Sequence, residues 1–354
     1  MTWAFETGGS IEGSPTVVDG TVYIGSYDHS VYAVDATTGT RQWAFETDDR
    51  ISSSPAVADG TVFIGSQDHS LYAIDAATGT REWTFETGDW VYSSPTVAGG
   101  TVVVGSVDGS VYAVDAATGT REWTVETDGK IKSSPTVVDG TVYIGSTDDS
   151  IYAIDAATGT REWTFETGDW VWSSPTVVDG TLYVGSDDTT LYALEAATGT
   201  ERWTVETDDE VSSSPTVVDG TVFVGSYDDS LYAVDAATGS ERWHFETGGG
   251  VDSSPTVAAG TVFVGSWDGA VYAVAAETGE HRWTFETDDW VWSSPTVVDG
   301  TLFVGSVDGT LYALNAGVSG SSRGSRVILG PLGHHRRSHS GDGSLDGNHR
   351  DDSG

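Results

Sequence analysis

The sequence contains no cysteine, one methionine and only two lysines, and its 15 basic residues stand against 54 acidic residues. Without cysteine there is no disulfide framework, no thiolate metal ligand and no Cys-x-x-Cys-His site for haem. A formal net charge of -39 repels phosphate backbones, which argues against a nucleic-acid partner. Apolar runs are short as well, far below the roughly 18 residues of a membrane-spanning helix, so we expect no membrane span.

The first residues, MTWAFETGG, have neither the basic region nor the apolar core of an export signal. The sequence as given therefore predicts a cytoplasmic protein, whereas a missing upstream signal segment would make it exported or attached to the cell surface. The excess of carboxylates over lysines is similar to that of proteins from salt-accumulating halophiles, whose solvated carboxylates keep the chain soluble. The alternative is an acidic protein that steers a cationic partner.

A forty-residue period runs through the sequence without a slip as far as residue 315. One unit, residues 91–130, consists of four short apolar runs separated by turn residues, which predicts four strands per unit. A tryptophan and a proline mark the register in every unit. The tryptophans are Trp3, Trp43, Trp83, Trp123, Trp163, Trp203, Trp243 and Trp283, and we expect them to pack between neighbouring units. The prolines are Pro15, Pro55, Pro95, Pro135, Pro175, Pro215, Pro255 and Pro295.

The turns between these runs have their own signals. Asp19 and Gly20 separate two apolar runs, and both residue types tolerate the positive φ of a hairpin turn. Each proline falls inside the first run of its unit, and proline cannot donate to a strand ladder, so we place that run at a sheet edge facing a central channel. Asp28 and its equivalents in the next loop are expected to cap their own turns.

Four-stranded units of this length, repeated about four to eight times, are typical of β-propellers. We therefore predict an all-β fold, an eight-bladed β-propeller of four-stranded antiparallel blades over residues 1–315, and we expect a monomer. The chain begins with an outermost strand, Thr2 to Thr7, so this N-terminal strand should complete the last blade and close the ring. Residues 316–354 lose the period and are rich in Gly, Ser, Arg and His, which predicts a disordered tail or a frame-shifted end of the gene.

The run from Ala33 to Trp43 reads Ala-x-Asp-Ala-x-Thr-Gly-x-x-x-Trp and resembles the tryptophan-docking repeat of the pyrroloquinoline-quinone (PQQ) propellers. That family includes the quinoprotein alcohol dehydrogenases and the non-enzymatic propeller subunit of the outer-membrane protein assembly machinery. The resemblance covers residues 1–315 and implies the propeller fold. It leaves an enzyme and a scaffold both open, because function lies in sites grafted on folds.

The quinoprotein dehydrogenases resemble one another further in a vicinal cysteine pair, calcium-binding Glu and Asn side chains, a catalytic Asp and a tryptophan floor. This chain has no cysteine, and its only asparagines, Asn315 and Asn348, lie at and beyond the end of the last repeat. No repeated arrangement of Ser, His and Asp suggests a nucleophilic triad. We therefore predict no catalytic residue, no metal site and no cofactor, with PQQ and calcium as the alternative.

The repeats differ from one another in four loop columns, which should lie on one face of the disc because successive strands alternate in direction. Two columns fall between the outer run of one unit and the inner run of the next, and two fall beside the Asp28-type aspartate. These columns are rich in Trp, Tyr and His and contain both lysines of the chain. From them we predict a ligand-binding face that consists of Trp90, Tyr92, Lys130, Lys132, Trp170, Trp172, Trp267, Trp290 and Trp292.

Two functions are compatible with such a face. The first is a non-catalytic scaffold that binds a protein or peptide, and the second is a PQQ- or sugar-binding protein, for example a degenerate quinoprotein oxidoreductase. The lysines between flanking aromatics suggest an anionic or planar ligand, a sugar or an acidic peptide. Drift in exposed loops would explain the same variation without any ligand.

Overall fold

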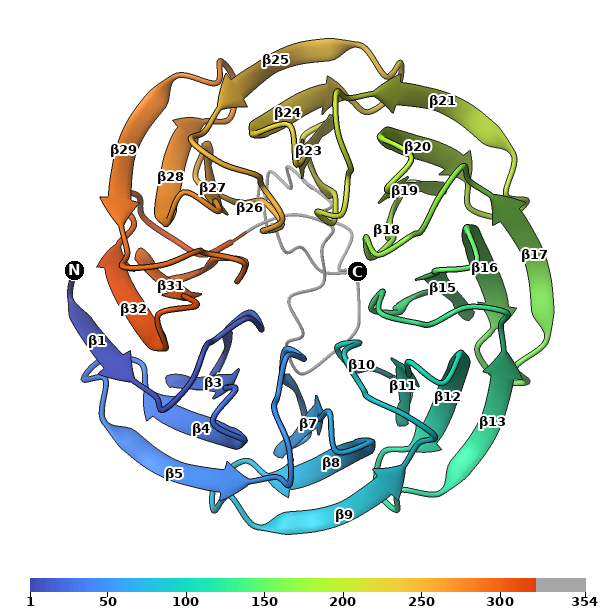
Figure 1. The fold of residues 1–354 in the computed structure, drawn as a ribbon, viewed down its shortest axis with the longest axis vertical. Coiled ribbons are helices and arrows are strands. Elements are labelled where there is room, and N and C mark those ends of the chain that lie inside the picture. The colour runs from blue at the N-terminus through green and yellow to red at the C-terminus, as the bar shows by residue number, and fades with distance from the viewer. Residues whose placement is uncertain (323–354) are drawn as a thin grey trace, which may run out of the picture.

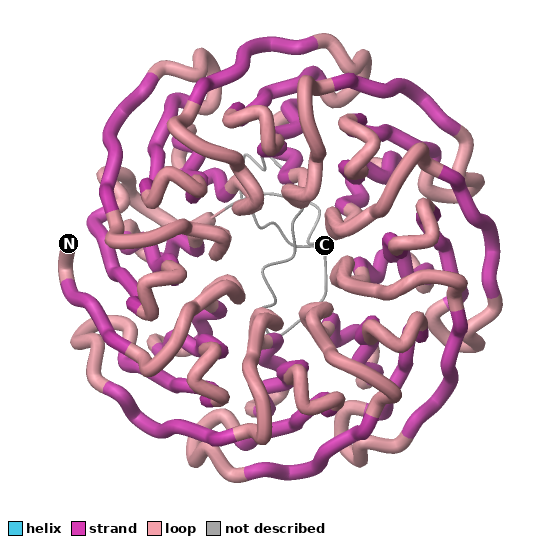
Figure 2. Tube along the Cα trace, viewed as in Figure 1, coloured by secondary structure: helices cyan, strands magenta, loops and turns pink. Residues whose placement is uncertain are grey.

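The computed structural model describes residues 1–322. This part of the chain forms 32 strands and no helix, and the strands make eight four-stranded sheets around a central axis (Figures 1 and 2). The prediction of an eight-bladed propeller with antiparallel blades is confirmed. Among the described residues no helix is long and apolar enough to cross a membrane.

Each blade has four strands from the axis to the rim. The innermost strands are β2 (Thr16–Val18), β6 (Ala56–Ala58), β10 (Thr96–Ala98), β14 (Thr136–Val138), β18 (Thr176–Val178), β22 (Thr216–Val218), β26 (Thr256–Ala258) and β30 (Thr296–Val298). The second strands are β3 (Thr21–Gly25), β7 (Thr61–Gly65), β11 (Thr101–Gly105), β15 (Thr141–Ser146), β19 (Thr181–Gly185), β23 (Thr221–Gly225), β27 (Thr261–Gly265) and β31 (Thr301–Gly305). The third strands are β4 (Ser30–Asp35), β8 (Ser70–Asp75), β12 (Ser110–Asp115), β16 (Ser150–Asp155), β20 (Thr190–Glu195), β24 (Ser230–Asp235), β28 (Ala270–Ala275) and β32 (Thr310–Asn315). The outermost strands are β1 (Trp3–Glu6), β5 (Arg41–Glu46), β9 (Arg81–Glu86), β13 (Arg121–Glu126), β17 (Arg161–Glu166), β21 (Glu201–Glu206), β25 (Glu241–Glu246) and β29 (His281–Glu286).

The ring closes through the first strand of the chain. β1 pairs antiparallel with β32, with Trp3 opposite Ala313, and the Thr2 amide donates to the Ala313 carbonyl at 2.7 Å. The last blade therefore combines β1 with β30, β31 and β32, which is the predicted N-terminal closure. Figure 1 shows β1 and β32 side by side, with the two ends of the colour scale in one blade.

The predicted tail begins at residue 316, directly after the last residue of β32. Its first residues, 316–322, lie against the innermost strand of the last blade, because the Ser322 amide donates to the Val297 carbonyl and the Gly300 amide to the Gly320 carbonyl, both at 2.8 Å. These residues therefore extend the propeller beyond the predicted boundary. Residues 323–354 lie outside the described part of the chain, so for them disorder stays a prediction.

Each outer-strand tryptophan packs on the next blade. Trp3 Nε1 donates to the Ala36 carbonyl at 3.1 Å, and the indole lies against Gly39, whose φ is +71°. A Cβ atom at Gly39 would lie 2.7 Å from Trp3 Cδ2, so only glycine leaves room for the ring. The other seven tryptophans of this column donate in the same way to the alanine 33 residues later. Their predicted packing role between blades is confirmed.

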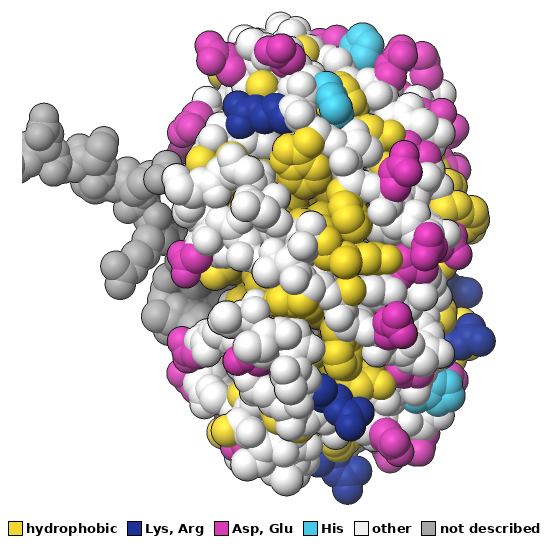
Figure 3. Space-filling model, turned by 90° about the vertical axis from the view of Figure 1, so that its left-hand side faces the viewer, with side chains coloured by type: hydrophobic (Ala, Val, Ile, Leu, Met, Phe, Trp, Pro, Cys, Tyr) yellow, Lys and Arg dark blue, Asp and Glu magenta, His cyan; other side chains and the backbone are white. Residues whose placement is uncertain are grey.

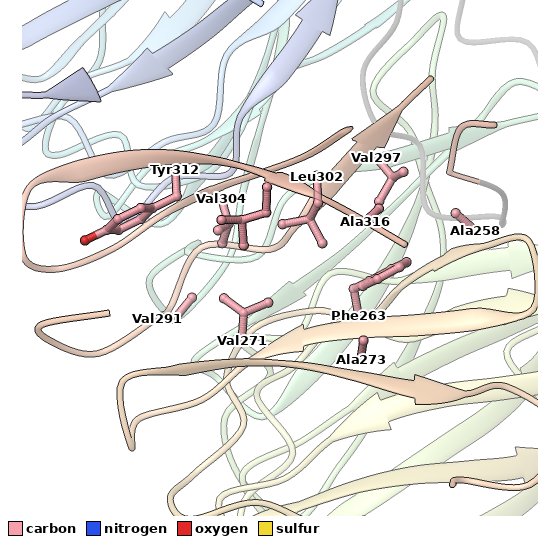
Figure 4. Packing of buried hydrophobic residues seen from close by; sticks show 11 residues of the cluster. Ala258, Phe263, Val271, Ala273, Val291, Val297, Leu302, Val304, Tyr312 and Ala316 are labelled. Atoms are coloured by element: carbon pink, nitrogen blue, oxygen red, sulfur yellow. The ribbon is translucent and has the colours of Figure 1, made fainter. Parts of the chain in front are cut away.

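The hydrophobic core is divided into layers between neighbouring blades. In the layer that Figure 4 shows, Phe263 and Val271 from one blade contact Leu302 and Val304 from the next, and all four are buried. Burial of such a side chain contributes about 1.5–3 kcal/mol. Because every layer needs two blades, each blade depends on both neighbours for its buried surface.

Serines form a closed hydrogen-bond belt around the axis. The Ser14 amide donates to Ser54 Oγ at 2.8 Å, and equivalent bonds lead from blade to blade until the Ser294 amide donates to Ser14 Oγ at 3.1 Å. Threonines add a second belt, in which Thr16 Oγ1 donates to the Pro55 carbonyl at 2.6 Å. This bond recurs in seven of the eight blades, and Ala56 replaces the threonine in the eighth. The belts line the central channel.

The prolines do not lie inside the innermost strands, so the predicted position is wrong by one residue. Pro15 directly precedes β2, which begins at Thr16, and the other prolines precede their strands in the same way. The proline carbonyls accept the threonine bonds of the second belt, and the missing N–H is not needed there. The innermost strands still form the sheet edges at the axis, as predicted.

The rim of the disc combines acidic and hydrophobic side chains. The glutamates that end the outermost strands, such as Glu6, Glu46 and Glu86, are exposed. Figure 3 views the disc from the side that is on the left in Figure 1 and shows carboxylates scattered around a band of hydrophobic side chains, with few basic side chains. On the face opposite the variable columns, the turns have the expected geometry, with φ of 48° at Asp19 and 76° at Gly20.

Candidate functional site

The four variable columns lie on one face of the disc, which we call the variable face. In each blade, the loop that enters from the preceding outer strand accepts one backbone bond from the loop between the second and third strands. The Tyr27 amide, for example, donates to the Ser10 carbonyl at 2.8 Å. Equivalent bonds of 2.9 or 3.0 Å join Gln67 to Arg50, Val107 to Trp90, Thr147 to Lys130, Asp187 to Trp170, Tyr227 to Glu210, Trp267 to Gly250 and Val307 to Trp290. The loop backbone is thus the same whichever side chains it bears.

The Asp28-type aspartates beside these loops have a structural role. Asp28 Oδ1 accepts a bond from its own turn, at the Ser30 amide, and the same bond recurs in five other blades. The predicted capping is confirmed in these six blades, whereas Oδ1 of Asp68 and of Asp148 has no partner among the described residues. Its Oδ2 accepts from Tyr32 OH at 2.8 Å and from the Gly8 amide of the preceding loop at 2.6 Å. The Gly8 bond joins this turn to the loop that comes from the preceding blade, whereas the tyrosine bond lies within the blade and recurs in every blade.

Lys132 lies at the centre of a group of predicted residues that we call the aromatic arc, namely Trp90, Tyr92, Trp170 and Trp172. Its Nζ lies 3.6 Å from the centroid of the Trp172 ring and 5.1 Å from that of the Tyr92 ring. Burial between the rings and the charge of Lys130 lower the pKa of Lys132. Two aromatic rings, which come from the blades on either side, thus already stabilise this ammonium group by cation–π contacts.

The outer parts of the arc are more open. Trp90 packs edge-on against Tyr92 at 5.8 Å, and Trp170 is stacked on Trp172 at 6.1 Å with an angle of 15° between the rings. Trp90 and Trp170 are 40% and 48% exposed, which is unusual for tryptophan. Lys130 is exposed beside them, and its amide donates to Thr147 Oγ1.

A second group, which we call the aromatic cluster, consists of Tyr227, Trp267, Trp290 and Trp292. Trp267 lies at its centre, 4.5 Å from Tyr227, 5.7 Å from Trp290 and 6.4 Å from Trp292 between ring centroids. Trp290 is 45% exposed. The indole N–H groups of Trp267 and Trp292 are buried without a hydrogen-bond acceptor among the described residues, which costs stability.

The charges of Asp252 and Asp187 act on Tyr227 of the aromatic cluster, and together with Glu12 we call these residues the carboxylate group. Burial, Glu12 and Asp187 raise the pKa of Asp252 to about 7, although solvent still reaches its side chain. Burial also raises the pKa of Asp187 to about 6, against the effect of a 2.9 Å bond from Ser212. The charges of Glu12 and Asp187, which come from two other blades, thus both act on Asp252.

Glu12 belongs to a hydrogen-bonded chain with Tyr27 and Ser52. Its Oε2 accepts a 2.5 Å bond from Tyr27 OH, whose oxygen in turn accepts from Ser52 Oγ at 3.1 Å. The guanidinium of Arg50 lies 5.2 Å from the centroid of the Tyr27 ring. Burial raises the pKa of Glu12 in spite of these partners.

The structure therefore divides the predicted residues into two groups. Trp90, Tyr92, Lys132, Trp170 and Trp172 form one contiguous arc with Lys130 at its edge. The other predicted residues, Trp267, Trp290 and Trp292, join the aromatic cluster in blades that lie half a turn away. Sequence reasoning missed Tyr227 and the whole carboxylate group. The same four columns contain these residues. A search of the columns for every aromatic ring and for every carboxylate would therefore have found them.

The residues of the variable face do not fit PQQ and calcium as the resemblance implies them. The vicinal cysteines are missing from the chain, and Asn315, the only asparagine among the described residues, ends β32 and is not in the variable columns. The Trp172 ring, which could have formed a floor for a planar cofactor, has the Lys132 ammonium 3.6 Å from its centroid. We derive no chemical step through a quinone.

Comparisons with solved structures agree on the fold. BamB from Moraxella catarrhalis is 22% identical, with a TM-score of 0.78, and the match covers 88% of this chain and 98% of that one. A europium-containing methanol dehydrogenase is 18% identical over 86% of this chain and 85% of the other, with a TM-score of 0.75. The quinohemoprotein alcohol dehydrogenase from Comamonas testosteroni is 19% identical over 91% of this chain and 77% of the other, also with a TM-score of 0.75. At these identities the likeness concerns the fold alone.

No curated protein sequence matches this chain. One family model does match it, in overlapping segments over residues 1–50, 28–129, 91–171, 166–251 and 228–321, and together these segments cover the propeller. That model describes the outer membrane protein assembly factor BamB. The chain therefore belongs to the BamB family of PQQ-type repeat propellers.

Proposed function

We propose that the protein is a non-catalytic scaffold that binds a partner protein or peptide through the variable face. The observation that supports this most is the contrast between backbone and side chains in the eight loop pairs. Each pair forms the same backbone bond, whether the two columns bear Tyr27 and Ser10 or Trp267 and Gly250. The fold therefore does not require tryptophan in these columns.

The exposed indoles support the same proposal. Trp90, Trp170 and Trp290 are the large rings that the described residues leave most open, and all three are in one column of the variable face. Tryptophan is enriched among the residues that dominate protein interfaces, because it buries a large apolar area with few rotatable bonds. The eight docking tryptophans, in contrast, all bond to a neighbouring blade.

Affinity capture from an extract in concentrated potassium chloride tests the proposal with the full chain as bait. The variant Lys130→Ala/Lys132→Ala/Trp170→Ala should lose the partner that the wild type retains. The matched control, Asp139→Asn/Asp179→Asn, changes two turns on the opposite face, where asparagine tolerates the positive φ of 49° and 48°. A partner that binds the first variant and the wild type equally would contradict the proposal.

The alternative, a PQQ- or sugar-binding protein, has one observation in its favour. The parallel rings of Trp170 and Trp172 offer a flat apolar surface of the kind on which a sugar or a planar ring can stack. Absorbance spectra of the purified protein with added PQQ and calcium distinguish the two functions. A stoichiometric quinone signal would favour the alternative, and its absence would leave the scaffold.

A further inference from the structure

The two halves of the variable face differ in charge. One half has Lys132 and Lys130 between Tyr92 and Trp172, and the other half has Asp252 and Glu12 together with the aromatic cluster, while the charge of Asp187 acts on both Lys132 and Tyr227. Among residues 1–322 the ion pairs are His69 with Asp89, Arg202 with Glu195, Arg242 with Asp235 and His244 with Glu241. None of these pairs includes a member of the carboxylate group.

In the lysine half, the cation already has its aromatic partners. The Lys132 ammonium lies over Trp172 and close to Tyr92, so its charge faces two rings that come from the blades on either side. An anion that approached Lys132 would have to displace these contacts and would also face Asp187, whose charge acts on the same lysine. The predicted preference for an anionic ligand is therefore not what this geometry favours.

The opposite half has the same kinds of groups, but its cation, Arg50, lies over the Tyr27 ring and acts on Glu12, not on Asp252. Tyr227, Trp267, Trp290 and Trp292 present four rings where the first half has two next to its lysine. Asp252, which lies between Tyr227 and Trp267 in the sequence, has no basic partner among residues 1–322, and the charges of Glu12 and Asp187 act on it. Cations bind over tryptophan faces more strongly than over the rings of tyrosine or phenylalanine.

We propose that the aromatic cluster and Asp252 bind a lysine or arginine side chain from a basic segment of the partner protein. This side chain would be held there as Lys132 is held by Trp172 and Tyr92 half a turn away. The inference rests on the proposed function and specifies the chemistry of the partner.

Three further observations support this assignment. Removal of a proton from Asp252 is unfavourable without a nearby cation, as its raised pKa shows, so a bound ammonium or guanidinium group relieves the repulsion within the carboxylate group. The net charge of -39 steers basic segments toward the protein from a distance. The 45% exposure of Trp290 leaves one ring of the cluster open to the partner.

Fluorescence anisotropy with three dye-labelled peptides tests the proposal on the full-length protein. The first peptide alternates glycine with lysine and arginine, the second has the lysines acetylated and the arginines replaced by citrulline, and the third has glutamate in place of every basic residue. We expect only the basic peptide to bind. Asp252→Asn and Trp292→Ala should each weaken its binding about tenfold, which corresponds to about 1.4 kcal/mol.

One variant serves as the matched control. Asp139→Asn makes the same change of charge on the opposite face and should leave binding within about twofold of the wild type, a difference of less than about 0.4 kcal/mol. Circular dichroism and gel filtration verify that each variant remains folded.

The outcomes separate the inference from the proposed function. Binding of the glutamate peptide that depends on Lys132 would overturn the inference and leave the variable face as a partner site. Equal binding of the basic peptide to wild type, Asp252→Asn and Trp292→Ala would overturn it as well, as would no binding of any peptide. If the capture experiment also showed no dependence on the variable face, the proposed function itself would fall.

Discussion

The threonine belt around the axis has one gap, and filling it should stabilise the propeller. Ala56 occupies the threonine position of its blade, so the carbonyl of Pro95 lacks the bond that seven other proline carbonyls accept. The substitution Ala56→Thr restores the missing donor. Ala56 is buried, with 1% of its surface exposed, so the new hydroxyl group would have few alternatives to this bond.

A second blade shows that the threonine fits. Thr256 has Phe263 opposite it in the neighbouring strand, as Ala56 has Phe63, and an alanine follows two residues later in both innermost strands. Thr256 Oγ1 bonds to the Pro295 carbonyl at 2.5 Å. The hydrogen bond contributes about 1 kcal/mol and the buried methyl group about 0.8 kcal/mol, so Ala56→Thr should raise the free energy of unfolding by about 1–2 kcal/mol.

Thermal unfolding followed by circular dichroism in potassium chloride measures this effect. An increase of about 1.5 °C in the midpoint is expected for each kcal/mol, because the unfolding entropy of a propeller of this size is about 0.7 kcal/mol/K. Thr256→Ala serves as the reverse substitution and should lower the midpoint by a similar amount. If Ala56→Thr left the midpoint unchanged or lowered it, the belt would not contribute to stability in the way that we infer.

Three further predictions concern the packing between blades and the variable face. Trp123→Ala removes a docking indole whose Nε1 donates to the Ala156 carbonyl at 2.8 Å, and it should cost about 3–5 kcal/mol in chemical denaturation, whereas the exposed Trp170→Ala should cost less than about 1 kcal/mol. Gly199→Ala should lower the free energy of unfolding by about 1–3 kcal/mol more than Gly220→Ala does. Both glycines have positive φ, but only a Cβ at residue 199 would meet an indole, at 2.7 Å. The raised pKa of Asp252 means that the folded protein binds more protons than the unfolded chain between about pH 4 and 7, so this carboxyl group makes stability fall as the pH rises through that window. Asp252→Asn should therefore increase the melting temperature at pH 8 and change it little at pH 4, and an equal increase at both values would contradict this account.

The forty-residue period was sufficient to predict the fold because each unit contains its own strand and turn signals. Strand number, blade number and the closure by β1 all followed from counting tryptophans and from the position of the first one. The one-residue error at Pro15 had a physical cause. Proline lacks an N–H group, which indicated an edge, but its carbonyl serves the belt between blades, and this bond connects residues 39 apart in the sequence.

The candidate site could be predicted only in part. Variation among otherwise identical repeats located the columns, but side chains in these columns meet across blades, at distances that depend on how the blades are arranged. Lys132 lies between rings from two other blades, and the neighbours that raise the pKa of Asp252 include Glu12, which is 240 positions away in the sequence. Such contacts are not visible in a comparison of columns.

The most direct test of the central claim uses the 14 tryptophans of the chain as probes. Eight of them dock between blades, and the other six, Trp90, Trp170, Trp172, Trp267, Trp290 and Trp292, are in the variable columns. Fluorine NMR of protein labelled with 5-fluorotryptophan, assigned by single Trp→Phe variants, reports on each ring separately. On titration with the basic peptide, we predict shifts of Trp267, Trp290 and Trp292 and no change in the eight docking indoles. Shifts confined to the docking indoles, or bound peptide without a shift at Trp290 and Trp292, would contradict the account.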